Sequence, residues 1–331
     1  MASVDVTLRL LLLGSAVAAC AVEDAPIEPL PATLAATGIG GPGVHAFVPQ
    51  YPLWTDGARK PRWIYLPPGA VIDGRDADAW QLPVGTKLWK QFAFDRRAET
   101  RFMERTREGW RYATYVWSAS GDDAVLAPAA GAPTSATLAD GRVHHAPSEP
   151  ECRLCHADDR PVLAFTALQL SPDRDPEALH AEPRPPGAID LTTLVASGVL
   201  VDYTASVAPR IAARSSVERA ALGYLHGNCG SCHRDGGAAA SVGMILAQPV
   251  AGRSRVRSTT IDVASQFTTA AAEHRIAAGA PDRSVLVTRV RARTPALQMP
   301  PLGTQLVDAD AVAQLSRWID QLPDLAQGDL P

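Results

Sequence analysis

The chain has 331 residues, of which 46% are hydrophobic and 20% are charged, and its formal net charge at pH 7 is −4. This composition is typical of a globular protein and not of a disordered one, and the length predicts two domains or one large one. Proteins that bind nucleic acid through their net charge are strongly basic, whereas this chain is slightly acidic. No nucleic acid is therefore expected as a partner.

Residues 1–19 are typical of a bacterial export signal. Arg9 precedes an apolar run from Leu10 to Ala19, which is too short to span a bilayer as a permanent helix. Asp5 is atypical, because a positive charge is expected at that point of a signal. The alternative interpretation is a buried apolar helix.

Cys20 is expected to carry a lipid. It ends the stretch Val17–Cys20, which resembles the lipobox where signal peptidase II cuts before a cysteine that is then acylated. Four of the five cysteines lie in two C-x-x-C-H motifs, so Cys20 is left over and needs an explanation in an exported protein. Cleavage by signal peptidase I at Ala16–Ala18 is the alternative. The expected location is the periplasmic side of a bacterial membrane, lipid-anchored or otherwise soluble in the periplasm.

Residues 20–44 are rich in Pro, Ala and Gly without clear periodicity, which predicts a flexible tether. Residues 45–205 are predicted to form a β-rich domain. Short segments rich in aromatic and β-branched residues predict strands over residues 62–67, 87–94, 99–106 and 110–119.

Alternation along the segment 87–94 is expected to place Leu88, Lys90 and Phe92 on one face of the strand and the intervening side chains on the other. Six of the seven tryptophans lie in the predicted β-rich domain: Trp54, Trp63, Trp80, Trp89, Trp110 and Trp117. They predict a core built from aromatic side chains. A ligand-stacking role for one or two of them is the alternative.

A second domain, predicted to be mostly helical, is expected over residues 206–331, with the boundary near 181–186 or just after 205. Ser215 and Glu218 predict a capping box at the start of a helix, which is expected to end near His226–Gly227.

The chain is expected to end in another helix, capped by Asp308 or Asp310. Its apolar stripe is formed by Val312, Leu315, Trp318 and Ile319. The predicted fold class is therefore α+β, with a β-rich aromatic domain followed by a mostly α domain.

Two C-x-x-C-H motifs carry the chemistry of the sequence. This motif attaches c-type haem: its cysteines form thioethers with the vinyl groups of the porphyrin, and the histidine ligates the iron. The spacing is short because both sulfurs must reach the same edge of the macrocycle while the chain turns to present the imidazole. The sequence therefore predicts two covalently bound haem c groups, held by Cys152, Cys155 and His156 and by Cys229, Cys232 and His233.

Two other kinds of cysteine site are alternatives. A thioredoxin-like redox pair usually lies in a βαβ context, whereas the second motif follows a predicted amphipathic helix. Four cysteines can also hold a structural zinc. However, 73 residues lie between Cys155 and Cys229, and zinc requires no histidine after each pair.

The order of elements around the second motif resembles a class I cytochrome c domain. In that resemblance His233 is the proximal ligand, and Met299, in a proline-rich loop before the last helix, is the distal one. Met244 is the competing candidate, although it is expected to be a packing residue. The resemblance also implies that the two end helices cross at a small residue, so Gly223 is expected to face Trp318.

The first motif lacks such a context, because no amphipathic helix precedes it and no Met-Pro follows it before the second domain. Candidate sixth ligands of its iron are His144, His145, His180 and Met103. Each of them, taken singly, is expected to be structural or exposed, so an open or weakly ligated iron is an alternative. Of the remaining histidines, His226 is too close in sequence to its motif to ligate from the far side, and His274 is expected at the surface.

Several segments resemble an uncharacterised family of exported bacterial two-haem c-type cytochromes. The resemblance runs from about Tyr51 to Leu322 and rests on YPLWTDGARKPRWIYLPPG, LPVGTKLWKQFAF, ETRFMER, GWRYATYVW, PSEPECRLCH, YLHGNCGSCHRDGG and MPPLGTQLVDADAVAQLSRWID. It implies two haems and electron transfer, with no established substrate. It carries onto Cys152, Cys155, His156, Cys229, Cys232, His233 and Met299, and assigns no sixth ligand to the first haem.

The predicted function is outer-sphere electron transfer between periplasmic or membrane-associated redox proteins, with a lipid anchor holding the chain at the membrane. One alternative is a haem enzyme, peroxidase-like or acting on another small molecule, that uses an open first haem. The other is a binding module in the N-terminal half, with electron transfer confined to the second haem.

Overall fold

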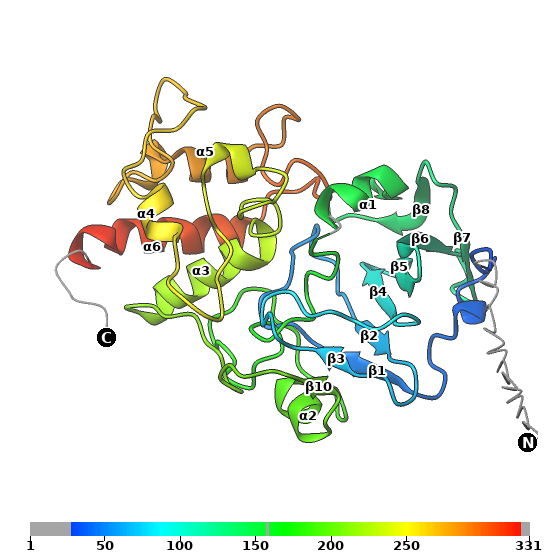
Figure 1. The fold of residues 1–331 in the computed structure, drawn as a ribbon. Coiled ribbons are helices and arrows are strands. Elements are labelled where there is room, and N and C mark those ends of the chain that lie inside the picture. Colours follow the sequence, from blue (N-terminus) through cyan, green and yellow to red (C-terminus); the bar gives the residue numbers. More distant parts are fainter. Residues whose placement is uncertain (1–27, 157–158, 326–331) are drawn as a thin grey trace, which may run out of the picture.

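The structure is a computed structural model that describes residues 28–156 and 159–325. The predicted signal peptide and Cys20 lie outside these residues. No helix within the described ranges is long and apolar enough to cross a membrane. Strands dominate the first half of the chain and helices the second, so the predicted α+β class is confirmed (Figure 1).

A six-stranded antiparallel sheet organises the N-terminal half, in the order β1-β2-β4-β5-β6-β7. Its strands are β1 (Val44–Phe47), β2 (Arg62–Tyr65), β4 (Lys87–Ala93), β5 (Arg97–Thr106), β6 (Gly109–Trp117) and β7 (Ala124–Leu126). The four predicted strands are confirmed as β2, β4, β5 and β6, which lie side by side in the sheet (Figure 1).

Both faces of this sheet are covered. Leu88 packs with Ile64 in a core on one face, whereas its neighbour Trp89 packs with Phe102 and Tyr115 in a core on the other. Successive side chains of a strand point to opposite faces, so the alternation predicted for β4 is confirmed. Five of the six tryptophans predicted to form an aromatic core belong to these two cores: Trp63, Trp80, Trp89, Trp110 and Trp117.

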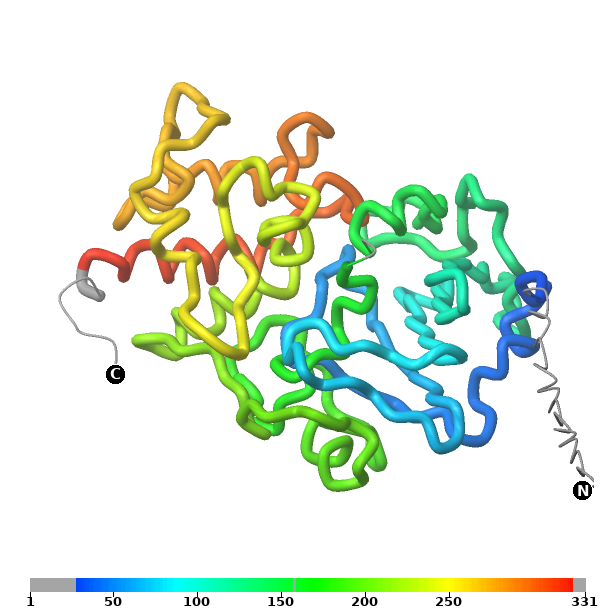
Figure 2. The backbone as a smooth tube through the Cα atoms, viewed as in Figure 1, coloured from blue at the N-terminus to red at the C-terminus, as the bar shows by residue number. Residues whose placement is uncertain are grey.

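Part of the predicted tether is folded onto the sheet. Leu34 is 2% exposed and its amide donates to the Ala124 carbonyl, 2.9 Å away, and the Trp89 indole donates to the Thr37 hydroxyl at 2.8 Å. The segment 28–44 runs along the sheet beside β7 (Figure 2). The flexible tether expected over 20–44 therefore does not include residues 28–44. The few apolar side chains of this segment, such as Leu34, pack in the core of the sheet.

Smaller elements complete the N-terminal half. In chain order they are β3 (Ile72–Asp73), β8 (Ala132–Thr137), β9 (Val143–Ala146), α1 (Glu149–Cys155), α2 (Leu191–Ala196) and β10 (Leu200–Val201), together with a 3-10 turn at Ala35–Thr37. β3 pairs in parallel with β10, and β8 pairs with β9 in a hairpin. α1 follows that hairpin and packs beside β6 (Figure 1).

The C-terminal half is helical. It contains α3 (Ser216–Asn228), α4 (Val256–Thr260), α5 (Val285–Arg291) and α6 (Ala309–Leu325), with 3-10 turns at Ala240–Val242 and Pro281–Arg283. The Ser215 hydroxyl accepts a hydrogen bond from the Glu218 amide at 3.1 Å, as a cap requires. The Glu218 carboxylate instead accepts from the Arg214 amide at 2.7 Å, so only half of the predicted capping box forms.

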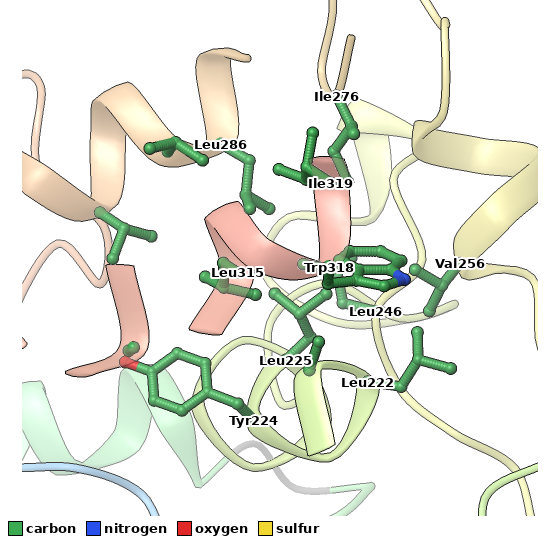
Figure 3. Close-up of a cluster of buried hydrophobic side chains, with 14 of the residues drawn as sticks. Leu222, Tyr224, Leu225, Leu246, Val256, Ile276, Leu286, Leu315, Trp318 and Ile319 are labelled. Atoms are coloured by element: carbon green, nitrogen blue, oxygen red, sulfur yellow. The ribbon is translucent and has the colours of Figure 1, made fainter. Parts of the chain in front are cut away.

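The first and last of these helices pack against each other. Leu222 and Leu225 of α3 meet Leu315, Trp318 and Ile319 of α6 in one buried cluster (Figure 3). The predicted apolar stripe of the last helix faces this cluster. Of the two candidate caps, the Asp308 carboxylate accepts from the Ala311 amide at 3.1 Å.

Gly223 does not face Trp318, contrary to the prediction. A Cβ atom built on Gly223 would lie 2.0 Å from the ring of Tyr51, and one on Gly227 would lie 2.3 Å from the Tyr51 carbonyl oxygen. The close contact on α3 is therefore made by the N-terminal half and not by the last helix. Tyr51 and Trp54 belong to the same buried cluster as the helices, so the two halves share a core.

Replacing Gly223 with alanine is expected to lower the free energy of unfolding by about 1–3 kcal/mol, because the new methyl group overpacks against the Tyr51 ring. Alanine is otherwise the better helix former by about 1 kcal/mol. In a Tyr51→Ala background the same change should therefore be neutral or stabilising. Urea unfolding of the four proteins of this cycle measures the coupling, and equal effects in both backgrounds would contradict the contact.

Candidate functional site

The first C-x-x-C-H motif lies on α1 itself. The Ser148 hydroxyl accepts from the Glu151 amide at 3.4 Å, and the Glu151 carboxylate accepts from the Ser148 amide at 2.8 Å, which completes a capping box. Cys152 and Cys155 are three residues apart on this helix and so project from one face. The spacing Ser148-x-x-Glu151 is the sequence signal for this helix that the sequence interpretation missed.

His156 ends α1 with its ring fixed from one side. Its Nδ1 lies 2.5 Å from the Pro161 carbonyl oxygen, and its own carbonyl accepts from the Tyr112 hydroxyl at 3.1 Å. Burial lowers the pKa of His156 to about 4, so the ring is neutral at pH 7. When Nδ1 donates its proton to a carbonyl, Nε2 is left with a lone pair for a metal.

The second motif is a tight turn at the end of α3. The amides of Cys232 and His233 both donate to the Cys229 carbonyl, at 3.2 and 2.9 Å. Gly230 permits this turn, because a Cβ atom there would lie 2.6 Å from the His226 carbonyl oxygen. The two cysteines are thereby held close together directly before the histidine.

The His233 ring lies against the segment that follows the motif. The Leu246 amide donates to the His233 carbonyl at 2.8 Å. Burial lowers the pKa of the ring, and the Met244 carbonyl acts in the opposite sense, so that carbonyl lies beside the ring. Nδ1 is nevertheless buried without a partner of full hydrogen-bond geometry in the described part of the chain. Met244 therefore meets His233 through its backbone.

The two motifs are in direct contact, although the sequence separates them widely. The pKa of the Cys155 thiol is raised and that of the Cys232 thiol is lowered, in each case chiefly by the interaction of the two thiols, so these side chains lie close together. All four cysteines of the motifs are free and partly exposed. Among residues 28–156 and 159–325, no three His, Cys, Asp or Glu side chains are grouped as a metal ion would require, so the four-cysteine zinc alternative finds no ligand set there.

An ion pair joins the segments that follow the two motifs. Both terminal guanidinium nitrogens of Arg234 reach the Asp159 carboxylate, at 2.6 and 2.7 Å. Arg234 directly follows His233, and its side chain is 7% exposed, against 53% for Asp159. This pair was not predicted from the sequence. Charged residues near the two histidines give no sign that the two segments meet.

Met299 lies on the loop between α5 and α6 and is partly buried. Its amide donates to the Arg289 carbonyl at 2.9 Å. The Arg289 guanidinium in turn contributes to lowering the pKa of His233, after burial. The Met299 backbone is thus bonded to a residue whose charge acts on the His233 ring.

Two of the candidate sixth ligands of the first iron have carboxylate partners. His144 is 4% exposed, and its Nε2 lies 3.3 Å from Glu99 Oε1. His180 places Nε2 at 2.9 Å from Asp308 Oδ2. Both rings are held by structural contacts that ligation of an iron by Nε2 would break.

The remaining candidates are exposed or belong to a core. His145 is exposed, and Met103 packs on the core of the sheet that contains Ile64 and Leu88. His226 accepts from the Gln248 amide through Nδ1 at 3.1 Å. His274 is exposed, as predicted.

The chain was compared with models of known protein families, with curated proteins and with solved structures, and no match was found in any of the three. The resemblance to two-haem cytochromes therefore remains a prediction.

Proposed function

We propose that the protein is an exported c-type cytochrome with two haems that passes electrons between redox partner proteins. Cys152 and Cys155 bind one haem, and Cys229 and Cys232 bind the other. The observation that carries the proposal is that the two motifs lie together. Arg234, next to His233, is paired with Asp159, three residues after His156, and the thiols of Cys155 and Cys232 interact. We call the two C-x-x-C-H motifs with their cysteines the two haem clamps. Because one cysteine of each clamp lies next to the other, the thioether edges of the two haems would lie close together, as an electron relay needs.

The residues of both motifs fit a haem. In each motif the cysteines project together before the histidine, from a helix in the first and from a turn in the second. The hydrogen bond of His156 to Pro161 orients Nε2 for iron. Haem, when bound, supplies the one-electron couple of its iron. The chain supplies the covalent clamp, the proximal imidazoles and the ion pair that holds the two clamps in contact.

The second haem is proposed to lie in a class I cytochrome c-like domain with Met299 as its distal ligand. The packing of α3 against α6, and the place of Met299 on the partly buried loop that leads into α6, support this assignment. Met244 is the weaker candidate because its carbonyl already lies beside the His233 ring. A thioether ligand raises the reduction potential relative to a second imidazole.

A second candidate function is a haem enzyme that uses the first haem with an open distal side. It is favoured by one observation: His144 and His180 are both committed to carboxylates, and His145 is exposed. An iron without a sixth protein ligand would bind small molecules such as cyanide or peroxide.

The location of the protein is part of the proposal. Export and acylation at Cys20 would place the folded body on the periplasmic side of the membrane, where c-type haem is attached and where redox partners are available. Residues 1–27 lie outside the described part of the chain, so this element of the proposal rests on the sequence alone.

Haem counting together with ligand binding tests the proposed function. The purified chain is expected to carry two haems by the pyridine haemochrome assay, to accept one electron per haem in an anaerobic titration, and to keep its spectrum when cyanide is added. One haem per chain, or none, would contradict the proposal. Two haems with a cyanide-sensitive high-spin component, lost in His156→Ala, would favour the enzyme.

A further inference from the structure

Three basic residues form one row across the sheet. Arg62 of β2 stands opposite Lys90 of β4, and Lys90 stands opposite Arg101 of β5. Directly paired residues share a face of a sheet, so the three side chains emerge together. Lys60 precedes Arg62 by two residues and acts electrostatically on Lys90. We call these four residues the basic row.

The basic row is costly for a protein without a bound anion. Like charges directly opposite each other destabilise a sheet, and burial of an unpaired charge adds to the cost. Lys60 and Arg62 are only 3% and 4% exposed. Burial, followed by Arg62, Arg101 and Lys60, lowers the pKa of Lys90 well below its usual value.

Several donors of the row lack acceptors. Arg62 Nε is buried without a hydrogen-bond partner in the described residues. The Lys90 ammonium lies 4.8 Å from the centre of the Phe92 ring, and none of the hydrogen bonds among the described residues involves it. Glu99 uses Oε1 for Arg101, at 2.6 Å, and its Oε2 is buried without a hydrogen-bond partner among the described residues, so no hydrogen bond joins it to Lys90.

The carboxylates near the row balance only part of its charge. Glu99 pairs with Arg101 and faces His144, while Glu182 accepts from the Lys60 amide at 2.6 Å and acts on Arg62. Asp308, which acts on Lys60 more weakly than Glu182 does, is already bound by His180.

The row faces the first motif. Arg101 pairs with Thr114, two residues along β6 from Tyr112, so Arg101 and Tyr112 lie on the same face of the sheet. The Tyr112 hydroxyl donates to the His156 carbonyl, so residues of this face reach the motif directly.

We propose that the basic row binds the propionate carboxylates of the haem attached to Cys152 and Cys155. The propionates are the only ionised substituents of the porphyrin ring and lie at the edge opposite the thioethers. Arg62 and Arg101 offer forked donors for a carboxylate, and Lys90 offers a point charge. The inference rests on the proposed haem at the first motif. A free oxyanion, such as phosphate, also presents negatively charged oxygens and is the alternative ligand of the basic row.

The test is a spectroelectrochemical titration of the full chain carrying Lys90→Gln, in buffers with and without phosphate. Loss of a positive charge beside the propionates should favour the ferric form of one haem about tenfold at a fixed potential, which is about 59 mV for one electron. The potential of the other haem should stay unchanged. The matched control is Lys87→Gln, which lies on the same strand but on the opposite face, and it should leave both potentials unchanged.

The other outcomes distinguish the haem propionates from a free oxyanion as the group bound by the basic row. A wild-type potential that shifts on addition of phosphate, with the shift lost in Lys90→Gln, would overturn the propionate assignment in favour of a free oxyanion. Identical potentials in wild type, Lys90→Gln and Lys87→Gln, with two haems counted in each, would overturn the inference and leave the proposed function standing. A chain without haem at the first motif would overturn both.

Discussion

Replacing Cys152 and Cys155 together with serine is expected to halve the haem content, from two haems per chain to one. Serine forms no thioether, so the first haem would depend on His156 alone and be lost on purification. The second clamp is built by the end of α3 and its own turn, so its haem should remain. The pyridine haemochrome assay, combined with the mass of the intact chain, measures both effects.

The reciprocal change, Cys229→Ser with Cys232→Ser, is the matched comparison and should also leave one haem. Ser231→Ala, inside the second motif, controls for the substitution itself and should leave two. A wild-type haem content that is unchanged by the first pair of substitutions would mean that the first motif does not hold haem.

Replacing Met299 with alanine is expected to abolish the weak sulfur-to-iron charge-transfer band in the near infrared and to lower the potential of one haem by on the order of 0.1 V. The reason is that a thioether stabilises Fe(II) more than water or an imidazole does in its place. Near-infrared absorption of the oxidised protein and a redox titration resolve the two effects.

Met244 supplies the control for this change. Its carbonyl lies beside the His233 ring, so Met244→Leu should keep the band and shift the potential little. If the band survives in Met299→Ala and disappears in Met244→Leu, Met244 and not Met299 is the distal ligand.

Elements that depend on local patterns were predictable from the sequence. The strands β2, β4, β5 and β6 follow from runs of aromatic and β-branched residues, and the start of α3 follows from the Ser215 cap. The last helix follows from its apolar stripe. The candidate cysteines and histidines could be selected from the sequence because C-x-x-C-H is a short contiguous motif, and haem attachment at them stays a prediction.

Features that depend on tertiary contacts were not predictable. A glycine within a helix, such as Gly223, can mark a place where another residue packs close to the backbone. Here that residue is Tyr51, which lies far away in the sequence. The meeting of Cys155 with Cys232 depends on how the two halves pack. The basic row appears only when the strand register is known, since β2, β4 and β5 each contribute one residue to it.

The folding of 28–44 onto the sheet was missed for a related reason. A segment rich in Pro, Ala and Gly resembles a linker in composition, and its attachment depends on a few contacts of Leu34 and Thr37 with distant strands. Such contacts leave no periodic signal in the sequence.

The central claim is that two haems lie next to each other because their clamps are in contact through Cys155 and Cys232. Electron paramagnetic resonance of the fully oxidised chain tests it most directly. We expect signals broadened by magnetic coupling between two ferric irons, which become a simple single-haem spectrum in either double cysteine variant. Two sharp, additive signals in the wild-type chain, identical to the sum of the spectra of the two variants, would contradict it.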